Sequence, residues 1–465
     1  MFNNDDTISA IATPLGEGGI GIVRLSGKES IEIAEKIFTS PKKRFLRDVT
    51  SYKLVYGHIQ DPSTGETVDE VLVAVMRSPH SYTREDIVEI NCHSGMVTLR
   101  RILELAIRGG ARLADPGEFT KRAFINGRVD LPQAEAVLDL IRAKTDESRR
   151  IAIEQLQGGL SEKITSLRDK LKDLCVHVEA YIDFPEDEIE IASKDEIAKS
   201  IEEIMKELQK LLKTYDEAKF FREGLSTAIV GRPNVGKSSL LNALLQKDRA
   251  IVTPMPGTTR DVIEEYLNIN GLPLRIMDTA GIRDVQNVAE KEGVKRSLQS
   301  IENADFVIAV FDSSEPFQDE DFEVIEKIKG KPLIIVVMNK CDLPSVSDKS
   351  VIASRFSPRD VLILDISALC GTGLEELKDR VFSSSLKEWK EEKEGVLVTN
   401  LRHKIAIENA ATSLGRALSC FEKNKPLEIV ALELRDSLDS LGEIVGAVTT
   451  DDILDSIFQN FCIGK

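Results

Sequence analysis

Residues 231–238 carry the sequence GRPNVGKS, whose residue types and spacing fit the binding of a nucleoside triphosphate. The glycines let the backbone turn tightly, so that successive N–H groups and the start of a following helix can face phosphate oxygens. Lys237 would neutralise the outer phosphates, and the hydroxyl of Ser238 would bind Mg²⁺. An apolar run at 225–230 predicts a strand before this loop, and an amphipathic helix is expected after it. A glycine-rich turn without a ligand is the alternative, and this context counts against it.

Three later segments would complete a nucleotide site. In the sequence DTAG at 278–281, the aspartate and the last glycine can reach the Mg²⁺ shell and the γ-phosphate. In the sequence NKCD at 339–342, the carboxylate of Asp342 can accept two hydrogen bonds from a guanine edge. The sequence SAL at 367–369 can add a backbone N–H to the base pocket. Each segment follows an apolar run that predicts a strand, at 274–277, 333–338 and 361–366.

These segments predict a guanine-nucleotide-binding domain, because ligands of open α/β sheets bind at the carboxyl ends of the strands. The segment 253–261 supplies further oxygens, and Thr259 can reach Mg²⁺ only when that segment closes on GTP. The residues expected to contact GTP are Asn234, Val235, Gly236, Lys237, Ser238, Ser239, Thr253, Thr258, Thr259, Asp278, Thr279, Ala280, Gly281, Asn339, Lys340, Asp342, Ser367 and Ala368.

Hydrolysis of GTP needs a group that orients the attacking water and positive charge that stabilises the transition state. Ile282 follows the DTAG segment, where Ras-like proteins carry a glutamine, and its aliphatic side chain cannot orient water. Glu290 is the candidate catalytic residue, with an ordinary surface acid as the alternative. The charge could come from Arg260 or Arg283, or from a monovalent cation bound beside the side-chain oxygen of Asn234.

Composition bounds the class of protein. The chain has 465 residues, 42% hydrophobic and 30% charged, and a formal charge of −17, which fits a soluble protein of several domains and excludes a uniformly basic nucleic-acid coat. The local basic run at 42–47 is interpreted as a solvated loop, with a basic patch as the alternative. Six cysteines without zinc or C-x-x-C spacing fit a reducing cytosol. With neither a signal peptide nor a membrane-length apolar run in the sequence, we expect a cytoplasmic protein.

Hydrophobic periodicity predicts four parts. Residues 1–118 alternate short strands with two helices, 119–220 and 387–465 are helical, and 221–386 form the nucleotide domain. The expected fold class is a multidomain α/β and α+β protein, in which a P-loop GTPase with a Ras-like doubly wound sheet is inserted in an all-helical domain and preceded by an α+β domain. The acidic run 183–190 is interpreted as a connector, with a metal site as the alternative.

The sequence resembles the MnmE (TrmE) family of tRNA modification GTPases along its whole length. The resemblance rests on the P-loop with Asn234, on PGTTRD at 256–261 and DTAGIR at 278–283, and on the C-terminal CIGK at 462–465. Several N-terminal pieces add to it, among them GIGIVRLSG at 19–27, YTRED at 82–86 and DPGEFT at 115–120.

The resemblance implies a K⁺-activated GTPase whose hydrolysis drives G-domain dimerisation and a conformational cycle. K⁺ would stand where an arginine finger otherwise does, and Glu290 falls on the family's catalytic glutamate. Mg²⁺ would be bound by Ser238 and Thr259. The implied K⁺ ligands are Asn234, Thr253, Met255 and Thr258.

The resemblance also implies a folate cofactor, 5,10-methylene- or 5-formyl-tetrahydrofolate, bound to the first domain. Arg24, Glu89, Arg128 and Lys465 fall on the positions associated with it. The implied assembly is a homodimer formed through the N-terminal domains, which joins the FAD protein MnmG in a heterotetramer or larger complex. Together the two proteins would add an aminomethyl or carboxymethylaminomethyl group to C5 of the wobble uridine, position 34, of certain tRNAs.

Two other functions remain as alternatives. A ribosome-assembly GTPase of the Era or Der kind should carry a KH-type module or a second G domain, and the sequence shows neither. A nucleotide-gated scaffold would bind GTP with incidental hydrolysis. Cys462 is interpreted as a structural or folate-pocket residue, with a nucleophile as the alternative, because no histidine near it in sequence would activate the thiol.

Overall fold

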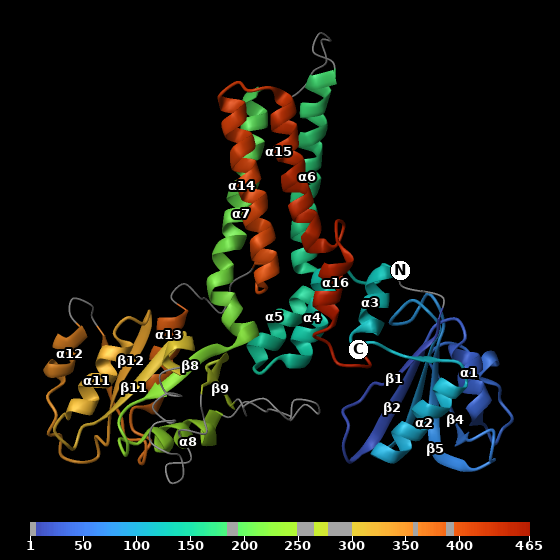
Figure 1. Cartoon of the computed structure of the whole chain (residues 1–465), viewed down its shortest axis with the longest axis horizontal. Helices are drawn as coiled ribbons and strands as arrows, with labels where there is room; N and C mark the ends of the chain where they lie inside the picture. Colours follow the sequence, from blue (N-terminus) through green and yellow to red (C-terminus); the bar gives the residue numbers. More distant parts are fainter. Residues whose placement is uncertain (1–5, 184–193, 249–264, 278–299, 357–360, 387–394) are drawn as a thin grey trace. The chain divides into compact units, whose positions relative to one another are not determined.

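The computed structural model describes residues 6–183, 194–248, 265–277, 300–356, 361–386 and 395–465 (Figure 1). The described chain forms two compact units. The N-terminal unit combines residues up to 138 with 441–465, and the second unit takes what lies between. The predicted boundaries at 118, 220 and 386 stay predictions.

A seven-stranded sheet forms the N-terminal unit, in the order β3-β4-β5-β6-β2-β1-β7. All neighbouring strands are antiparallel except β1 and β7. The helices α1 (Ser30–Ile37) and α2 (Met96–Arg108) bury their apolar residues against one face of this sheet. The strands are β1 (Ile8–Ile11), β2 (Gly18–Ser26), β3 (Phe38–Thr39), β4 (Lys53–Gln60), β5 (Thr67–Met76), β6 (Ile87–Ser94) and β7 (Arg112–Leu113).

Buried and exposed residues alternate along β5, so one face of the sheet lies in the core and the other faces outward. Val71, Val73 and Val75 are buried in the core, whereas Leu72 between them is 44% exposed on the other face. This is the pattern of an antiparallel sheet that is covered by helices on one side only.

The end of the chain belongs to the same unit. Helix α16 (Asp451–Phe458) packs on α3 (Glu118–Ile125), with Phe458 in their shared core. The N–H of Phe119 donates to the carbonyl of Lys465 at 3.2 Å. Gly464 has a φ of +96°, and a Cβ there would lie 2.4 Å from the carbonyl oxygen of Ile11. Glycine is therefore required where the tail passes β1.

Long helices come before and after the nucleotide domain in the second unit. Figure 1 shows α6 (Gly159–Asp183), α7 (Lys194–Glu223), α14 (Leu401–Glu422) and α15 (Leu427–Val445) side by side. Apolar residues at three- and four-residue spacing make the buried seams of α6 and α7, as the periodicity predicts. Two shorter helices precede α6: α4 (Leu131–Arg142), which begins in the N-terminal unit, and α5 (Asp146–Leu156). Within the described residues, no helix is both long and apolar enough to span a bilayer.

The nucleotide domain follows α7 through Gly224, whose φ is +80°. Its sheet has the order β13-β12-β11-β8-β10-β9, and every neighbouring pair is parallel except β10 and β9. The strands are β8 (Leu225–Val230), β9 (Glu265–Ile269), β10 (Leu272–Ile276), β11 (Phe306–Asp312), β12 (Leu333–Asn339) and β13 (Leu362–Asp365).

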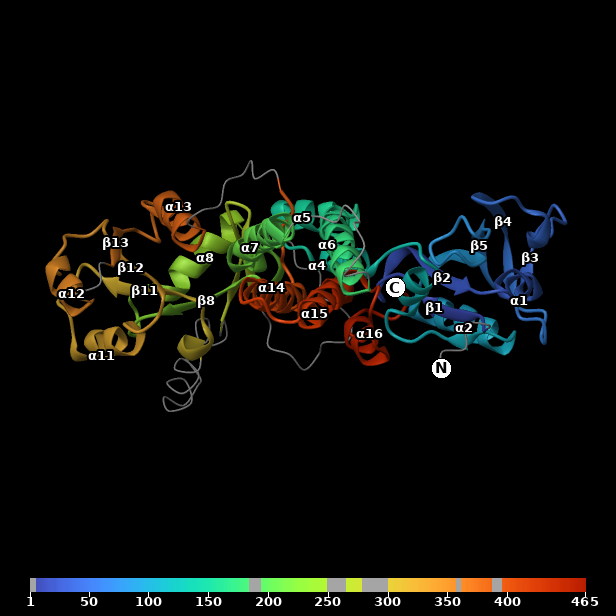
Figure 2. The same ribbon diagram turned by 90° about the horizontal axis from the view of Figure 1, so that it is seen from above.

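Helices cover both faces of this sheet. The residues of α8 (Lys237–Asp248) and α13 (Leu374–Ser385) share one core, and those of α11 (Asp319–Ile328) and α12 (Lys349–Phe356) share the other. Figure 2 shows α13 and α11 on opposite sides of the strands. The predicted fold class, a doubly wound sheet within a mixed multidomain protein, is confirmed.

Candidate functional site

The GRPNVGKS loop connects β8 to α8 and is shaped by two glycines that admit no side chain. Gly231 has a φ of +152° and Gly236 a φ of +101°. A Cβ on Gly231 would lie 2.3 Å from the carbonyl oxygen of Val310, and one on Gly236 would lie 2.1 Å from Nδ2 of Asn339. Both glycines are therefore needed for close packing of the loop against β11 and β12.

Lys237 lies at the start of α8, where the sequence predicts it. Its Nζ donates to the carbonyl oxygens of Gly231 and Arg232, both at 2.8 Å. Burial lowers the pKa of Lys237 to about 8, because desolvation disfavours the charged amine. The ammonium is thus held across the loop whose N–H groups and helix terminus would face a phosphate.

Asn339 joins three of the predicted motifs. Its Nδ2 donates to the carbonyl oxygen of Val235 in the P-loop at 2.8 Å. Its Oδ1 accepts from the N–H of Ala368 in the SAL segment at 3.0 Å. The residue is only 2% exposed, so both hydrogen bonds are shielded from water. The sequence marks Asn339 as a GTP contact, and the structure shows that it also braces the loops around the site.

The carboxyl end of β11 contributes two residues that the sequence analysis missed. Asp312 is buried and forms an ion pair of 2.5 Å with Lys340 of the NKCD segment. Burial acts to raise the pKa of Asp312, but hydrogen bonds from Lys340 and Ser314 outweigh it and hold the pKa below its usual value. Ser313 donates through both N–H and hydroxyl to the carbonyl oxygen of Asn339. The sequence does contain a signal for these two residues, because an acid and a serine stand at the end of an apolar run that predicts a strand.

The expected base pocket lies where the NKCD and SAL segments meet. The N–H of Cys341 donates to the carbonyl oxygen of Ile366 at 3.0 Å, which fixes the two segments side by side. The carboxylate of Asp342 is on an exposed residue, as a base contact requires. The hydroxyl of Ser367 is turned inward and accepts from the N–H of Cys370 at 3.1 Å. Leu369 is 86% exposed beside it.

A second cluster forms in the N-terminal unit from residues far apart in sequence. Arg24 of β2 faces Glu89 of β6, and its Nε and Nη2 lie 2.8 and 2.7 Å from Glu89 Oε1. Arg24 Nη1 donates to the carbonyl oxygen of Gly464 at 3.3 Å. Burial lowers the pKa of the neighbouring Lys465, and the positive charge of Arg24 acts in the same direction. Three predicted folate residues are therefore brought together.

Arg128 reaches this cluster through Tyr82. Its guanidinium carbon lies 4.8 Å from the centre of the Tyr82 ring, and the same ring lies 5.9 Å from the guanidinium carbon of Arg24. Arg128 also donates to the carbonyl oxygen of Tyr82 at 3.2 Å. Tyr82 was not predicted as a site residue, and its place between two arginines could not be read from its own motif.

Comparison with known proteins identifies the family of this chain. A family model described as the MnmE helical domain matches residues 131–462, and one described as the GTP-binding protein TrmE N-terminus matches residues 7–128. The tRNA modification GTPase MnmE of Alkaliphilus oremlandii is 50% identical over 99% of both chains. The chain belongs to the MnmE family. Relatives of the same name in Alkaliphilus metalliredigens and Clostridioides difficile are each 48% identical, also over 99% of both chains.

Membership of the MnmE family confirms the resemblance predicted from the sequence and the enzyme class, a GTP hydrolase of tRNA modification. Among the residues the structure describes, no three His, Cys, Asp or Glu side chains are grouped as metal ligands. Several predicted MnmE site residues lie outside the described residues and stay predictions: Thr253, Met255, Thr258, Thr259, Asp278, Thr279, Ala280, Gly281 and Glu290.

Replacing Asn339 by alanine should weaken GDP binding, because the P-loop and the SAL segment both lose their brace. Two hydrogen bonds of about 1 kcal/mol each correspond to about 2 kcal/mol, or a roughly 30-fold higher Kd. Isothermal titration calorimetry with GDP measures this. The matched control is Asn268→Ala in the β9–β10 turn, where one hydrogen bond from Gly271 is lost away from the loops. Equal Kd values for the two variants would contradict the bracing role.

Proposed function

We propose that this chain is a K⁺-activated GTPase that works with the FAD protein MnmG to add an aminomethyl or carboxymethylaminomethyl group to C5 of uridine 34 in certain tRNAs. The observation that carries the proposal is a braced guanine-nucleotide site in a chain that is similar to MnmE proteins over 99% of its length. Hydrolysis of GTP would drive G-domain dimerisation and the conformational cycle. The reaction would take place in the cytoplasm.

The described residues fit the nucleotide and its Mg²⁺. Lys237 and the N-terminus of α8 would bind phosphate oxygens, and Asp342 would accept hydrogen bonds from the guanine base. Ser238, in the first turn of α8, has a hydroxyl that can join the Mg²⁺ shell together with Thr259. Bound Mg²⁺ would neutralise charge on the β- and γ-phosphates. Glu290 would then orient the attacking water.

Asn234 supports the K⁺ proposal. The residue is exposed and has a left-handed backbone with a φ of +65°. Among the described residues, its side-chain amide has no hydrogen-bond partner, so its oxygen is available to a cation. K⁺ bound there, together with oxygens of Thr253, Met255 and Thr258, would supply the positive charge that an arginine finger supplies elsewhere.

An uncovered sheet face supports a homodimer. On the side of the N-terminal sheet away from α1 and α2, Leu54, Tyr56 and Leu72 are 60%, 47% and 44% exposed. Tyr56 pairs with Leu72 across β4 and β5, so the exposed apolar groups are contiguous. One row of this face runs from Leu54 through Ala74 and Glu89 to Arg24. A second copy applied to this face would bury the apolar groups next to the folate residues.

Deleting the protein from cells should remove the modified uridine from position 34 of the affected tRNAs, because the proposed reaction requires this chain. Mass spectrometry of tRNA nucleosides measures the loss. Expression of the unaltered chain should restore the nucleoside, and expression of Lys237→Ala, which lacks the phosphate-binding amine, should not. An unchanged nucleoside profile in the deletion strain would disprove the proposed function.

Replacing Na⁺ by K⁺ should raise kcat for GTP hydrolysis by about tenfold or more. This increase corresponds to at least about 1.4 kcal/mol of transition-state stabilisation. Asn234→Ala should abolish the difference, because the variant lacks the amide oxygen. Phosphate release at constant ionic strength measures both rates. Asn270→Ala is the control, since it removes another left-handed asparagine of the same domain without touching the P-loop. Equal rates of the unaltered chain in the two salts would exclude the cation role.

The full-length chain should bind 5-formyltetrahydrofolate, and Arg24→Ala should weaken that binding. Hydrogen bonds to a charged group contribute about 1.5–3 kcal/mol, so the Kd should rise roughly tenfold or more. Calorimetry measures the affinity, with Arg100→Ala as the control because Arg100 pairs with Glu104 on the surface of α2. Absence of any binding heat with the unaltered chain would rule out a folate site.

A further inference from the structure

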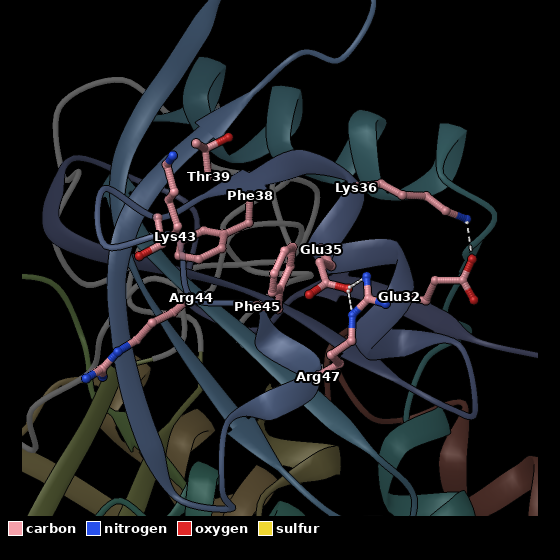
Figure 3. A pocket seen from close by; sticks show the side chains of 10 residues that line it. Glu32, Glu35, Lys36, Phe38, Thr39, Lys43, Arg44, Phe45 and Arg47 are labelled. Carbon is pink, nitrogen blue, oxygen red and sulfur yellow. Dashed lines mark hydrogen bonds and ion pairs between the residues drawn. The ribbon is translucent and has the colours of Figure 1, made fainter.

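A cavity of about 540 Å³ lies in the N-terminal unit, between α1, β3 and the loop that follows β3 (Figure 3). Its volume is in the range of about 300–1,000 Å³ that small-molecule sites occupy. Its lining includes Glu35, Phe38, Lys43, Arg44, Phe45 and Arg47. None of the residues of the GTP site or of the Arg24 cluster lines it.

The cavity carries excess positive charge in a chain whose formal charge is −17. Its two acids are each paired, Glu35 with Arg47 at 2.7 Å and Glu32 with Lys36 at 3.1 Å. Lys43 and Arg44 are exposed, and neither has an acidic partner among the described residues. These two cations are therefore free to bind an anion.

An exposed aromatic ring stands beside these cations. Phe45 is 55% exposed, and the guanidinium carbon of Arg47 lies 5.2 Å from the centre of its ring. Figure 3 shows Lys43 and Arg44 on one side of the Phe45 ring and the Glu35–Arg47 pair on the other. Phe38 forms a buried wall against β4, where a Cβ on Gly57 would lie 2.4 Å from its ring. Phe45 thus offers a stacking surface for a planar group.

Glu35 adds an unsatisfied acceptor. Both hydrogen bonds from Arg47 go to its Oε2 atom. Its Oε1 atom is shielded from solvent and accepts no hydrogen bond from the described residues. A buried acceptor without a donor is unfavourable, and a ligand N–H donated to this atom would satisfy it.

We propose that this cavity binds an unpaired nucleotide of an RNA strand. The base stacks on Phe45 and donates an N–H to Glu35, and the phosphates on either side of it bind Lys43 and Arg44. Aromatic stacking, a hydrogen bond to the base edge and cations for the backbone are the means by which proteins bind single-stranded RNA. The proposal rests on the proposed function, in which tRNA is the substrate.

Fluorescence anisotropy with the full-length chain tests this, using a tRNA transcript, a single-stranded RNA of about eight nucleotides and cytidine monophosphate as probes. The double variant Lys43→Glu/Arg44→Glu should weaken binding of both RNAs by about tenfold or more and lower the slope of log K against log salt by about 1.4, the contribution of two phosphate contacts. Phe45→Leu keeps an apolar side chain but loses the ring, and should also cost about tenfold.

Lys423→Glu/Lys425→Glu is the matched control, because it changes the net charge equally on the exposed connection between α14 and α15, in the other unit, and should leave RNA affinity within about twofold. A far-UV circular dichroism spectrum that matches that of the unaltered chain checks that each cavity variant is folded. Unchanged RNA affinity in the cavity variants, or an equal loss in the control, overturns the proposal. If cytidine monophosphate binds as tightly as the RNA, the cavity is a site for a free nucleotide, and this result also overturns the proposal.

The K⁺ dependence of hydrolysis and the nucleoside profile are independent of these results, so failure of the proposed function is recognised separately.

Discussion

Burial of the last turns of α7 joins the nucleotide domain to the helical bundle. Phe220 and Phe221 lie in the same hydrophobic core as the strands β8 and β10, and Ile151 of α5 enters it from the bundle. The hydroxyl of Ser148 in α5 donates to the carbonyl oxygen of Phe221 at 2.6 Å. Packed cores deform in discrete steps rather than continuously. A rearrangement of β8 and its phosphate loop would therefore shift α7 and α5 as well.

The nucleotide site depends on a small number of buried contacts. A single buried amide, that of Asn339, holds the phosphate loop and the base-pocket loop, and the close approach of Gly236 leaves no room for a side chain between them. Backbone groups and one buried asparagine therefore set the shape of the site, and this bracing keeps the site preorganised.

The sequence predicts the nucleotide domain well because each motif follows a strand rich in apolar residues, as in β12. The three- and four-residue spacing of apolar residues also predicts α6 and α7, because the residues at this spacing are the ones that become buried. Contacts that depend on how loops approach one another were not predictable, and Asp312, Ser313 and Tyr82 were missed. The hydrogen bond from Arg24 to Gly464 spans 440 residues, so only the family resemblance, not local pattern, could connect them.

The tail that passes β1 has a consequence for biosynthesis. Strands β1 and β2 leave the ribosome early, yet the cluster around Arg24 also needs Gly464 and Lys465. Residues that are translated 440 positions apart thus form one cluster. Arg24 can make this contact only in molecules whose translation has passed Gly464, so termination within the helical or nucleotide domains would leave the cluster incomplete.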